Sequence, residues 1–251
     1  MTGGLQGKVA LVTGSGRGIG AAIAEAYARE GASLCLADRD PHGGISEVSR
    51  RCRALGAAVL AITADVAVEA EVEAMFNRAA AEYGGVDVLV NNAGILTECR
   101  VEHMSTTMWD QMIAVDLRSV FLCSRAALPH MQQQRFGRII NIASQLGQKG
   151  GAGLAHYSAA KAGVIGFTRA LAREVGKHGI TANCIAPGPI ETPLAGGLSD
   201  EWIETLTASL PLGRFGQPSE VAPTAVLLAS TPGGNIYTGQ TLGPNSGDVM
   251  I

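Results

Sequence analysis

A tyrosine and a lysine four positions apart are the residues of this sequence best suited to move a proton. The segment Tyr157-Ser158-Ala159-Ala160-Lys161 lies where the sequence predicts a helix, so the Lys161 ammonium can lie beside the Tyr157 phenol on one helix face. A neighbouring cation favours the phenolate and lowers the tyrosine pKa from about 10 toward working pH. Such a tyrosine can act as a general acid or base. By itself, however, a Tyr and Lys pair at this spacing is more often a surface pair.

A glycine-rich loop supplies a candidate nucleotide site. Glycines permit a tight turn and a close approach of the backbone, so a helix N-terminus with unpaired N–H groups can meet a pyrophosphate. A predicted strand precedes the loop and a predicted helix follows it. The second strand ends at Asp38, close to the usual separation of about 20 residues for an acid that binds the adenosine ribose. We therefore expect the dinucleotide on Asp38 and along Thr13-Gly14-Ser15-Gly16-Arg17-Gly18-Ile19-Gly20.

The charges near this loop conflict over the choice of cofactor. Asp38 would repel the extra phosphate of NADP, whereas Arg17 or Arg39 would attract it. Asp40, which stands before Pro41, is better placed than Asp38 to cap the next helix, and this leaves Asp38 free for the ribose. We predict NAD as the cofactor, with NADP as the alternative.

Short apolar runs alternate with longer amphipathic stretches along the whole chain. Runs that are apolar throughout fit strands buried on both faces, and helical spacers between them imply right-handed parallel crossovers. The predicted fold class is therefore α/β, a doubly wound, Rossmann-like parallel sheet of about seven strands with helices on both faces. The predicted strands are 8–13, 33–37, 58–64, 86–91, 137–143 and 180–185, with a last apolar run at 240–243.

The segments between the predicted strands contain patterns typical of helices. The first, 19–29, is rich in alanine and stops at Gly31. Asp40-Pro41 predicts the start of a second helix, with an N-cap and proline at the first helical position. A long helix within 106–134 should be broken or kinked near Pro129, and further helices are expected at 156–177, at 199–209 and after Pro218.

Composition bounds the class of protein. With 251 residues, 47% hydrophobic and 16% charged, the chain can bury a large core, and no stretch resembles a linker, so we expect one domain over 1–251. A net charge of −3 without a basic stripe argues against nucleic acid. No leader-like start and no run of roughly 18 apolar residues is present, so we expect a cytoplasmic protein without a membrane partner. The five cysteines and five histidines are scattered and predict neither disulfides nor a metal site.

Taken together, these motifs resemble those of the classical short-chain dehydrogenase/reductase family, over essentially the whole chain. The resemblance implies hydride exchange between a nicotinamide and the carbinol carbon of a small secondary alcohol or ketone, coupled to proton exchange through Tyr157. Family motifs match in order at Thr13 to Gly20, Asp65, Asn91-Asn92-Ala93-Gly94, Ser144, Tyr157 with Lys161, and Pro187-Gly188 with Thr192.

The resemblance also implies a role for each matched residue. Ser144 would hydrogen-bond the substrate oxygen, and Lys161 would also hold the nicotinamide ribose. Further cofactor contacts are implied for Asp65 and Val66 near the adenine, for Asn92, Ala93 and Gly94, which would pack against and support the cofactor-binding strand, and for Pro187, Gly188, Ile190 and Thr192 around the nicotinamide.

One departure from the family pattern touches the catalytic group. Many members have an asparagine after a valine in the long helix, and its backbone carbonyl holds a water that reaches the lysine; this chain has Val115-Asp116-Leu117. Asp116 is tolerable if the backbone does the holding. An ionised Asp116 near Lys161 would instead stabilise the ammonium and partly oppose its field on Tyr157. We predict an active enzyme, with Asp116 counted among the catalytic residues.

A second departure lies near the C-terminus. Gly243-Pro244-Asn245-Ser246-Gly247 stands where the family usually has an ending like Val-Asp-Gly-Gly. We interpret this segment as neutral drift in a terminal loop. The alternative is that the tail helps to shape a pocket or a subunit contact.

The substrate pocket is placed only by its neighbours in the sequence. Residues 188–212 are interpreted as a mobile lid with glycines at its hinge and an apolar helix over the substrate. An uncharged or long substrate is favoured over a small acid, because none of the expected lining residues is charged. These residues are Leu96, Gln145, Leu146, Gly151, Leu154 and Trp202.

Several functions stay open. The leading prediction is an NAD-linked dehydrogenase of a polyol, sugar or other hydroxyl compound. The alternative within the family is a 3-oxoacyl-(acyl-carrier-protein) reductase, usually NADP-dependent, for which Arg135 and Arg173 would belong to a docking patch, although we interpret them as solvated arginines. A non-catalytic dinucleotide-binding protein is disfavoured by the intact Ser144, Tyr157 and Lys161, and an epimerase or dehydratase by the lack of room for a larger substrate domain. The family commonly pairs its two long helices into tetramers, so we expect a homotetramer.

Overall fold

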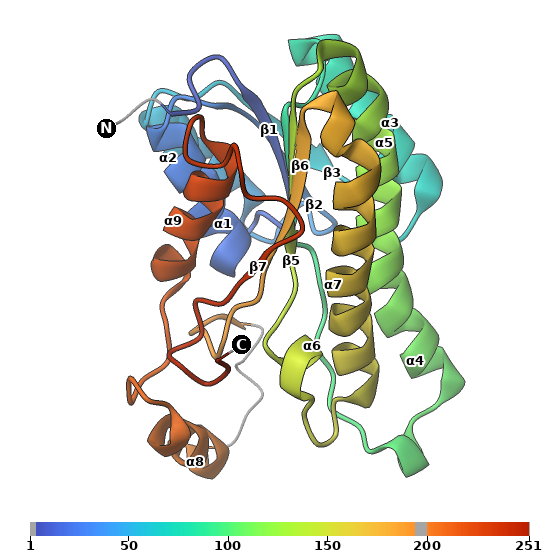
Figure 1. Cartoon of the computed structure of the whole chain (residues 1–251), viewed down its shortest axis with the longest axis vertical. Coiled ribbons are helices and arrows are strands. Elements are labelled where there is room, and N and C mark those ends of the chain that lie inside the picture. The colour runs from blue at the N-terminus through green and yellow to red at the C-terminus, as the bar shows by residue number, and fades with distance from the viewer. Residues whose placement is uncertain (1–3, 194–199, 251) are drawn as a thin grey trace.

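The computed structural model describes residues 4–193 and 200–250, in which seven strands form one parallel sheet (Figure 1). Their order is β3-β2-β1-β4-β5-β6-β7. The predicted doubly wound α/β fold is confirmed, and every predicted strand is present, with ends that agree to within two residues. The strands are β1 (Val9–Thr13), β2 (Ser33–Asp38), β3 (Val59–Thr63), β4 (Val88–Asn91), β5 (Gly137–Ile142), β6 (Ile180–Ile185) and β7 (Thr241–Leu242).

Mostly apolar sequence explains why these segments form interior strands. The residues of β1, β4, β5 and β6 are buried throughout, as parallel strands covered on both faces must be. From β1 the chain winds outward first through β2 and β3, and then through β4 to β7. A ligand of such a sheet binds where the winding reverses, at the edge formed by the carboxyl ends of the strands, here called the carboxyl edge.

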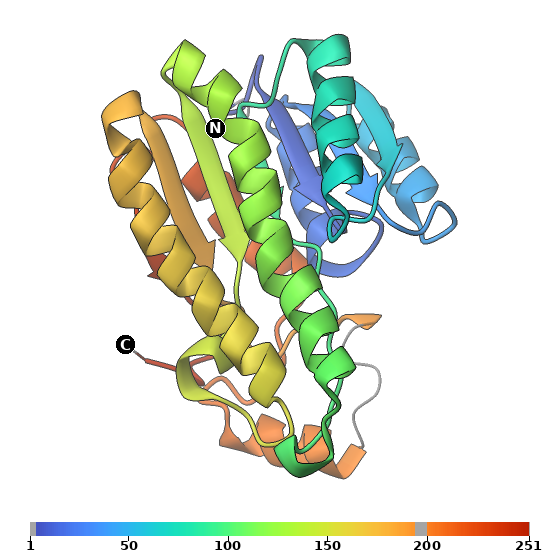
Figure 2. The same cartoon turned by 90° about the vertical axis from the view of Figure 1, so that its right-hand side faces the viewer.

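Helices cover both faces of the sheet (Figures 1 and 2). One face buries a hydrophobic cluster under α1 (Gly18–Arg29), α2 (Ile45–Ala54) and α9 (Pro218–Ala229). The other buries a second cluster under α3 (Glu69–Tyr83), α5 (Ser119–Gln134) and α7 (Ala155–Val175). In Figure 2, α5 and α7 run side by side across the front of the molecule.

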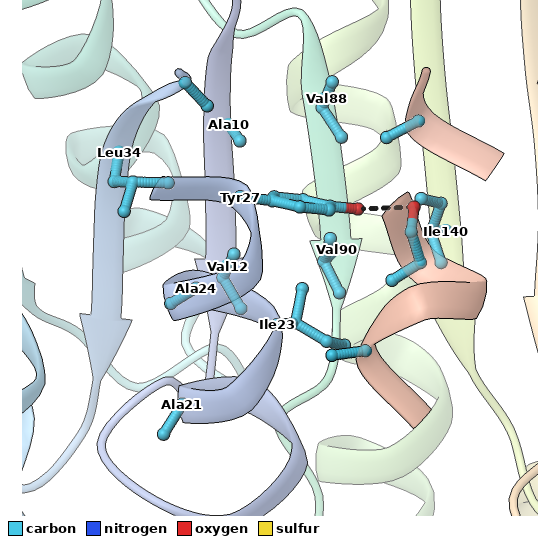
Figure 3. Packing of buried hydrophobic residues seen from close by; sticks show 14 of the residues in the cluster. Ala10, Val12, Ala21, Ile23, Ala24, Tyr27, Leu34, Val88, Val90 and Ile140 are labelled. Atoms are coloured by element: carbon cyan, nitrogen blue, oxygen red, sulfur yellow. Dashed lines mark hydrogen bonds between the residues drawn. The ribbon is translucent and has the colours of Figure 1, made fainter. Parts of the chain in front are cut away.

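Tyr27 ties α1 to α9 within the first cluster (Figure 3). Its side chain is fully buried, and its hydroxyl donates a 3.1 Å hydrogen bond to the Ala225 carbonyl. Burial raises the pKa of Tyr27, so this phenol stays neutral. Its single polar atom is satisfied, as a buried hydroxyl requires.

The second helix begins later than the sequence predicts. The Asp40 carboxylate accepts a 2.9 Å hydrogen bond from the His42 amide, which closes a local turn. Helix α2 starts only at Ile45, after Gly44, whose φ of 97° favours glycine. The predicted N-cap at Asp40 is therefore wrong, because its side chain satisfies a turn amide in competition with a helix amide.

The long helix is interrupted, but not at Pro129. Helix α4 (Thr106–Ile113) leads into one π-helical turn, Ala114–Arg118, before α5 begins, and Pro129 lies inside α5. The Ser119 hydroxyl donates to the Val115 carbonyl four residues earlier, a bond that bends helices. Single π-helical turns are frequent at functional sites, and this one contains Asp116.

Two further helices, α6 and α8, lie beyond the carboxyl edge, at the bottom of Figure 1. A short helix, α6 (Leu146–Lys149), follows β5. Residues 194–199 of the predicted lid lie outside the described residues, and α8 (Asp200–Ser209) follows them. Trp202 belongs to α8, but its side chain is also outside the described residues, so its substrate contact stays a prediction. Across the described ranges, no helix combines the length and apolar character that crossing a membrane needs.

Candidate active site

The carboxyl edge brings the predicted catalytic residues together. Ser144 follows β5, and Tyr157 and Lys161 stand one turn apart near the start of α7. All three are buried, with 7%, 8% and 4% of their surface exposed. The Lys161 Nζ lies 5.6 Å from the centre of the Tyr157 ring and donates a 3.0 Å hydrogen bond to the Ile142 carbonyl at the end of β5. The ammonium is thus fixed between strand and helix, beside the phenol.

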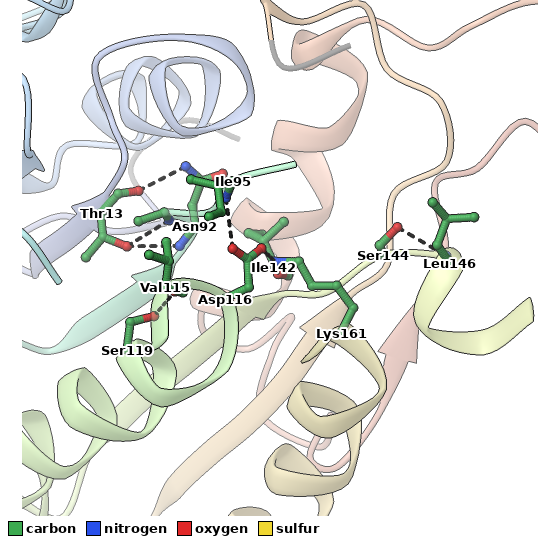
Figure 4. A network of polar contacts seen from close by, with 11 residues as sticks. Thr13, Asn92, Ile95, Val115, Asp116, Ser119, Ile142, Ser144, Leu146 and Lys161 are labelled. Carbon is green, nitrogen blue, oxygen red and sulfur yellow. Dashed lines mark hydrogen bonds and ion pairs between the residues drawn. The ribbon is translucent and has the colours of Figure 1, made fainter. Parts of the chain in front are cut away.

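Ser144 is oriented by the backbone that follows it. Its Oγ accepts a 3.1 Å hydrogen bond from the Leu146 amide (Figure 4). The Ser144 hydroxyl is also hydrogen-bonded to Tyr157. Two adjacent hydroxyls, one of them held by the backbone, can together bind the oxygen of a carbonyl group.

The charge balance at Tyr157 differs from the predicted one. Burial raises the pKa of the phenol, Lys161 lowers it, Asp116 raises it and the bond with Ser144 lowers it, so that the net pKa is raised. The prediction that Lys161 brings this pKa below about 10 is therefore wrong for this structure, because desolvation of the phenolate outweighs the nearby cation. At neutral pH Tyr157 is a phenol, the form that can donate a proton.

Asp116 reaches Lys161 through its side chain (Figure 4). The carboxylate is fully buried, its Oδ1 accepts a 2.8 Å hydrogen bond from the Ile95 amide, and its Oδ2 lies 3.1 Å from the Lys161 Nζ. Burial lowers the pKa of Lys161, but Asp116 and Tyr157 outweigh this effect and the net pKa is raised. Of the two alternatives drawn from the sequence, the structure shows the carboxylate beside the lysine.

The glycine loop is locked to the end of β4. The Asn92 side-chain amide donates to the carbonyls of Thr13 (2.9 Å) and Gly14 (3.0 Å). Gly14 has a φ of 61°, and a Cβ on it would lie 2.8 Å from the Ala93 Cα. A Cβ on Gly20 would lie 2.4 Å from the Asn92 Nδ2. These close approaches explain why glycine stands at both positions, and they hold the loop in one shape.

The start of α1 is open to an anion. Arg17 occupies the N-cap without a capping side-chain bond, and the first turn of α1 holds no acidic residue. The backbone N–H groups of this turn can therefore bind a phosphate. Half-buried Asp38 lies beside this turn: its Oδ2 accepts a 3.0 Å hydrogen bond from the Gly16 amide and its Oδ1 a 3.2 Å bond from the Asp40 amide. Arg17 and Arg39 are both exposed. The residues present therefore fit a dinucleotide.

The other predicted cofactor residues lie at the same edge. Asp65 follows β3, with its carboxylate bonded to the amide two residues further on, and Val66 beside it is buried. Thr192 lies against the glycine loop, since a Cβ on Gly18 would meet its Cγ2 at 3.4 Å. Between β6 and Thr192, the structure buries Pro187 and Ile190.

Aliphatic side chains gather around Tyr157. Leu96, Leu146 and Leu154 are half-buried and pack on the cluster that contains Tyr157. A Cβ on Gly151 would touch Leu146 and Leu154 at 3.3 Å each. Gln145 is buried, and its Oε1 has no hydrogen-bond partner among the described residues. The predicted pocket residues with described side chains therefore lie beside the catalytic group.

A cavity of about 600 Å³ opens beside Thr192, between the loop after β6 and α8. Its lining includes Glu191 and Arg214, which the sequence analysis missed. Arg214 pairs with Glu220 six residues further on, and this charged pair before a helix was the available signal. Neither Ser144 nor Tyr157 lines the cavity.

The C-terminal segment is not a free terminal loop. Asn245 is buried, and its side chain is hydrogen-bonded within the tail. Gly188 packs so tightly against it that a Cβ there would lie 2.6 Å from the Asn245 Cα. Asp248 forms an ion pair with Lys149 of α6. These contacts favour the alternative in which the tail helps to shape the pocket over the interpretation as drift.

Arg135 and Arg173 lie away from the carboxyl edge. Arg135 precedes β5 and donates a 2.9 Å hydrogen bond to the Lys177 carbonyl, and Arg173 lies in the last turn of α7. Ser144 stands at the other end of β5. Both arginines are exposed, and neither borders the catalytic group of its own chain.

Comparison with known proteins agrees with this fold and site. The profile of a family described as enoyl-(acyl carrier protein) reductase matches residues 14–247. The chain belongs to the short-chain dehydrogenase/reductase family, as its motifs indicate. It is similar to the 3-oxoacyl-(acyl-carrier-protein) reductases FabG of Vibrio cholerae (43% identical over 247 residues, 98% of this chain and 99% of that protein), Escherichia coli (42% over 246 residues, 98% and 99%) and Staphylococcus aureus (42% over 243 residues, 97% and 98%).

Membership of this family defines the broad activity. The chain is an oxidoreductase that acts on a CH–OH group and binds a nicotinamide dinucleotide, NAD or NADP. In the described part of the chain, no group of three His, Cys, Asp or Glu side chains could hold a metal ion.

Proposed function

We propose that this protein reduces the 3-oxo group of an acyl thioester to a 3-hydroxyl group, with a nicotinamide dinucleotide as hydride donor and Tyr157 as general acid. The similar proteins are named 3-oxoacyl-(acyl-carrier-protein) reductases, and they are 42–43% identical to this chain along nearly their whole length. This similarity favours the reductase over the polyol or sugar dehydrogenase, which is the leading prediction from the sequence. The observation that carries the reaction class is the meeting of Ser144, Tyr157 and Lys161 beside the glycine loop.

The roles of the residues follow from their positions. The dinucleotide supplies the hydride that reaches the carbonyl carbon. Ser144 holds the carbonyl oxygen, and Tyr157 transfers its phenolic proton to that oxygen as negative charge develops. Lys161 stabilises the phenolate that remains, because its ammonium lies beside the ring. Leu96, Leu146 and Leu154 offer an apolar wall to the acyl chain.

Asp38 supports NAD as the cofactor. Its carboxylate is held at the glycine loop by the Gly16 amide, at the place where the adenosine ribose would lie. A fixed negative charge there accepts hydrogen bonds from ribose hydroxyls and repels a ribose phosphate. Because Arg17 and Arg39 are exposed and long enough to approach a phosphate, NADP is the alternative that the test must include.

The direct test is a comparison of substrates with both cofactors. Acetoacetyl-CoA and longer 3-oxoacyl thioesters should be reduced, as followed by the absorbance of the reduced dinucleotide. Tyr157→Phe should lower turnover by a factor on the order of 10² to 10⁴. Turnover of polyols or sugars alone, without any 3-oxoacyl thioester, would reject this proposal and return the NAD-linked dehydrogenase, which Asp38 favours, as the function.

A further inference from the structure

We propose that Asp116 is a positioning residue that holds the Lys161 ammonium in place and keeps the Tyr157 phenol protonated to higher pH than the lysine alone would allow. The inference rests on the proposed reduction, in which Tyr157 donates the proton. It concerns the charge of one side chain and can be tested without any substrate.

The geometry ties Asp116 to Lys161 and to the backbone at once. One carboxylate oxygen accepts the Ile95 amide at 2.8 Å, and the other lies 3.1 Å from the Lys161 Nζ (Figure 4). Asp116 is fully buried and Lys161 is 4% exposed. Burying a carboxylate away from solvent costs free energy unless a nearby cation compensates its charge. Asp116 and Lys161 therefore hold each other in place.

The surrounding chain is shaped to admit this pair. The π-helical turn, Ala114–Arg118, carries Asp116 toward the carboxyl edge. Gly94 leaves the necessary space, because a Cβ there would lie 2.8 Å from the Asp116 Oδ2 and 3.5 Å from the Lys161 Nζ. Both features place the carboxylate where its field acts on the phenol.

The other polar groups near Tyr157 are neutral or cationic. Helix α7 contributes the Lys161 cation and also His156, which is fully buried with its Nε2 2.9 Å from the Thr97 Oγ1. Burial lowers the pKa of His156 more than Asp116 raises it, so the imidazole ring is neutral at pH 7. From β5, Ser144 contributes a hydroxyl. From β6, burial raises the pKa of the Cys184 thiol, which stays protonated near Lys161. Among the described residues facing the phenol, Asp116 therefore carries the negative charge.

The sign of the effect follows from Coulomb interaction. A carboxylate near Tyr157 disfavours the phenolate and offsets part of the attraction that Lys161 exerts on it. The phenol therefore remains the stable form over a wider pH range. After each proton transfer, the same field favours return of a proton to Tyr157.

The test is the direct titration of Tyr157 in the unliganded protein. Asp116→Asn removes the negative charge and keeps an oxygen for the Ile95 amide, while an amide nitrogen replaces the oxygen that faces the Lys161 Nζ. The phenolate absorbance of Tyr157 is obtained by subtracting the signal of a Tyr157→Phe protein, both for the wild-type protein and for the asparagine variant. This absorbance should appear at lower pH in the asparagine variant. The basic limb of the pH profile of kcat/KM for carbonyl reduction should move in the same direction.

A matched control is Asp87→Asn. Asp87 is 7% exposed and its carboxylate likewise accepts a backbone amide, from Val9 at 2.8 Å, and a side-chain amide, from Gln134 at 2.8 Å. It lies at the amino end of β4, away from Tyr157, so its variant should leave the titration unmoved. If the asparagine variant does not fold, Asp116→Ser can replace it, because serine also removes the charge. The Tyr157 phenolate should again appear at lower pH.

The outcomes separate the two proposals. Coincident Tyr157 titrations with and without the Asp116 charge would overturn the role given to Asp116, whatever the substrate. A shifted titration in a protein that reduces no 3-oxoacyl thioester would uphold the charge effect and reject the proposed function.

Discussion

Two carboxylates in different surroundings control the two ends of the site. Asp38 is half-buried and bonds the glycine loop through the Gly16 amide. Asp116 is fully buried and lies against Lys161. We propose that the first acts on the adenosine end of a bound dinucleotide and the second on the proton donor, so their substitutions should affect different measurements.

Asp38→Ala should change the preference between the two cofactors. Without the negative charge, the extra phosphate of NADP meets less repulsion, and the ratio of kcat/KM with NADPH to that with NADH should rise about tenfold, which corresponds to about 1.4 kcal/mol. Asp40→Ala is the control, because this exposed carboxylate bonds within its own turn. An unchanged ratio in the Asp38 variant would contradict the ribose assignment.

At the scale of elements, the contact between the loop after β4 and the π-helical turn decides where Lys161 points. Gly94→Ala should push Asp116 away, because the new Cβ would lie 2.8 Å from its Oδ2. Turnover should fall by a factor on the order of 10², as small displacements of a catalytic group can cause. Gly176→Ala is the matched control, since a Cβ there meets nothing within 4 Å. Equal activity of the two variants would show that this contact is dispensable.

The start of α9 supplies an acid-sensitive element. Glu220 accepts the Gln217 amide at 2.8 Å and pairs with Arg214 through both carboxylate oxygens. Arg214 first, and then the Gln217 amide, lower the pKa of Glu220 from about 4.5 to about 2. Because the folded pKa is depressed, this carboxylate contributes stability above the unfolded value, and the contribution is lost as pH falls from about 4.5 toward about 2.

Glu220→Gln should therefore lower Tm at neutral pH and flatten its fall in acid. Circular dichroism melts between neutral pH and pH near 2 measure both effects. Glu47→Gln is the comparison, because Glu47 pairs with Arg50, three residues further on along the exposed face of α2. If Tm falls with pH equally in the wild-type and Glu220→Gln proteins, the Glu220 carboxylate does not stabilise the start of α9.

At the scale of the whole molecule, the outer faces of α5 and α7 remain uncovered by other elements (Figure 2). Phe121 on α5 is 42% exposed, and α7 exposes small residues at Ala162, Gly166 and Ala170. Small side chains let helices approach closely, and an exposed aromatic side chain is suited to an interface. The homotetramer expected from the family resemblance stays a prediction, as does the cytoplasmic location.

Light scattering during gel filtration should give a mass about four times the 25.8 kDa of one chain. Phe121→Glu should shift the protein to smaller species, because a charge on this face would be desolvated on assembly. A single-chain mass for the wild-type protein at all concentrations would contradict the tetramer.

Local sequence patterns predicted the fold class and the strand positions, which the structure confirms, and the family motifs named the candidate residues of the catalytic group. Continuous apolar runs and glycine spacing are local patterns, and each carries its physical cause within a few residues. Because parallel strands end at one edge, residues after β1, β4 and β5 had to meet there. The family resemblance assigned Asn92 and Ser144 to the same site as Gly14, and in the structure all three follow strands that end at this edge.

Only the tertiary structure decided how charge is distributed at that site. Asp116 and Lys161 lie on different segments, and their 3.1 Å contact depends on a π-helical turn that no periodicity predicts. Desolvation by packed neighbours, chiefly, raises the pKa of Tyr157; Lys161 opposes this rise and Asp116 adds to it. Distances between remote side chains, and the solvent removed around them, arise from packing of the whole chain, which local sequence patterns do not encode.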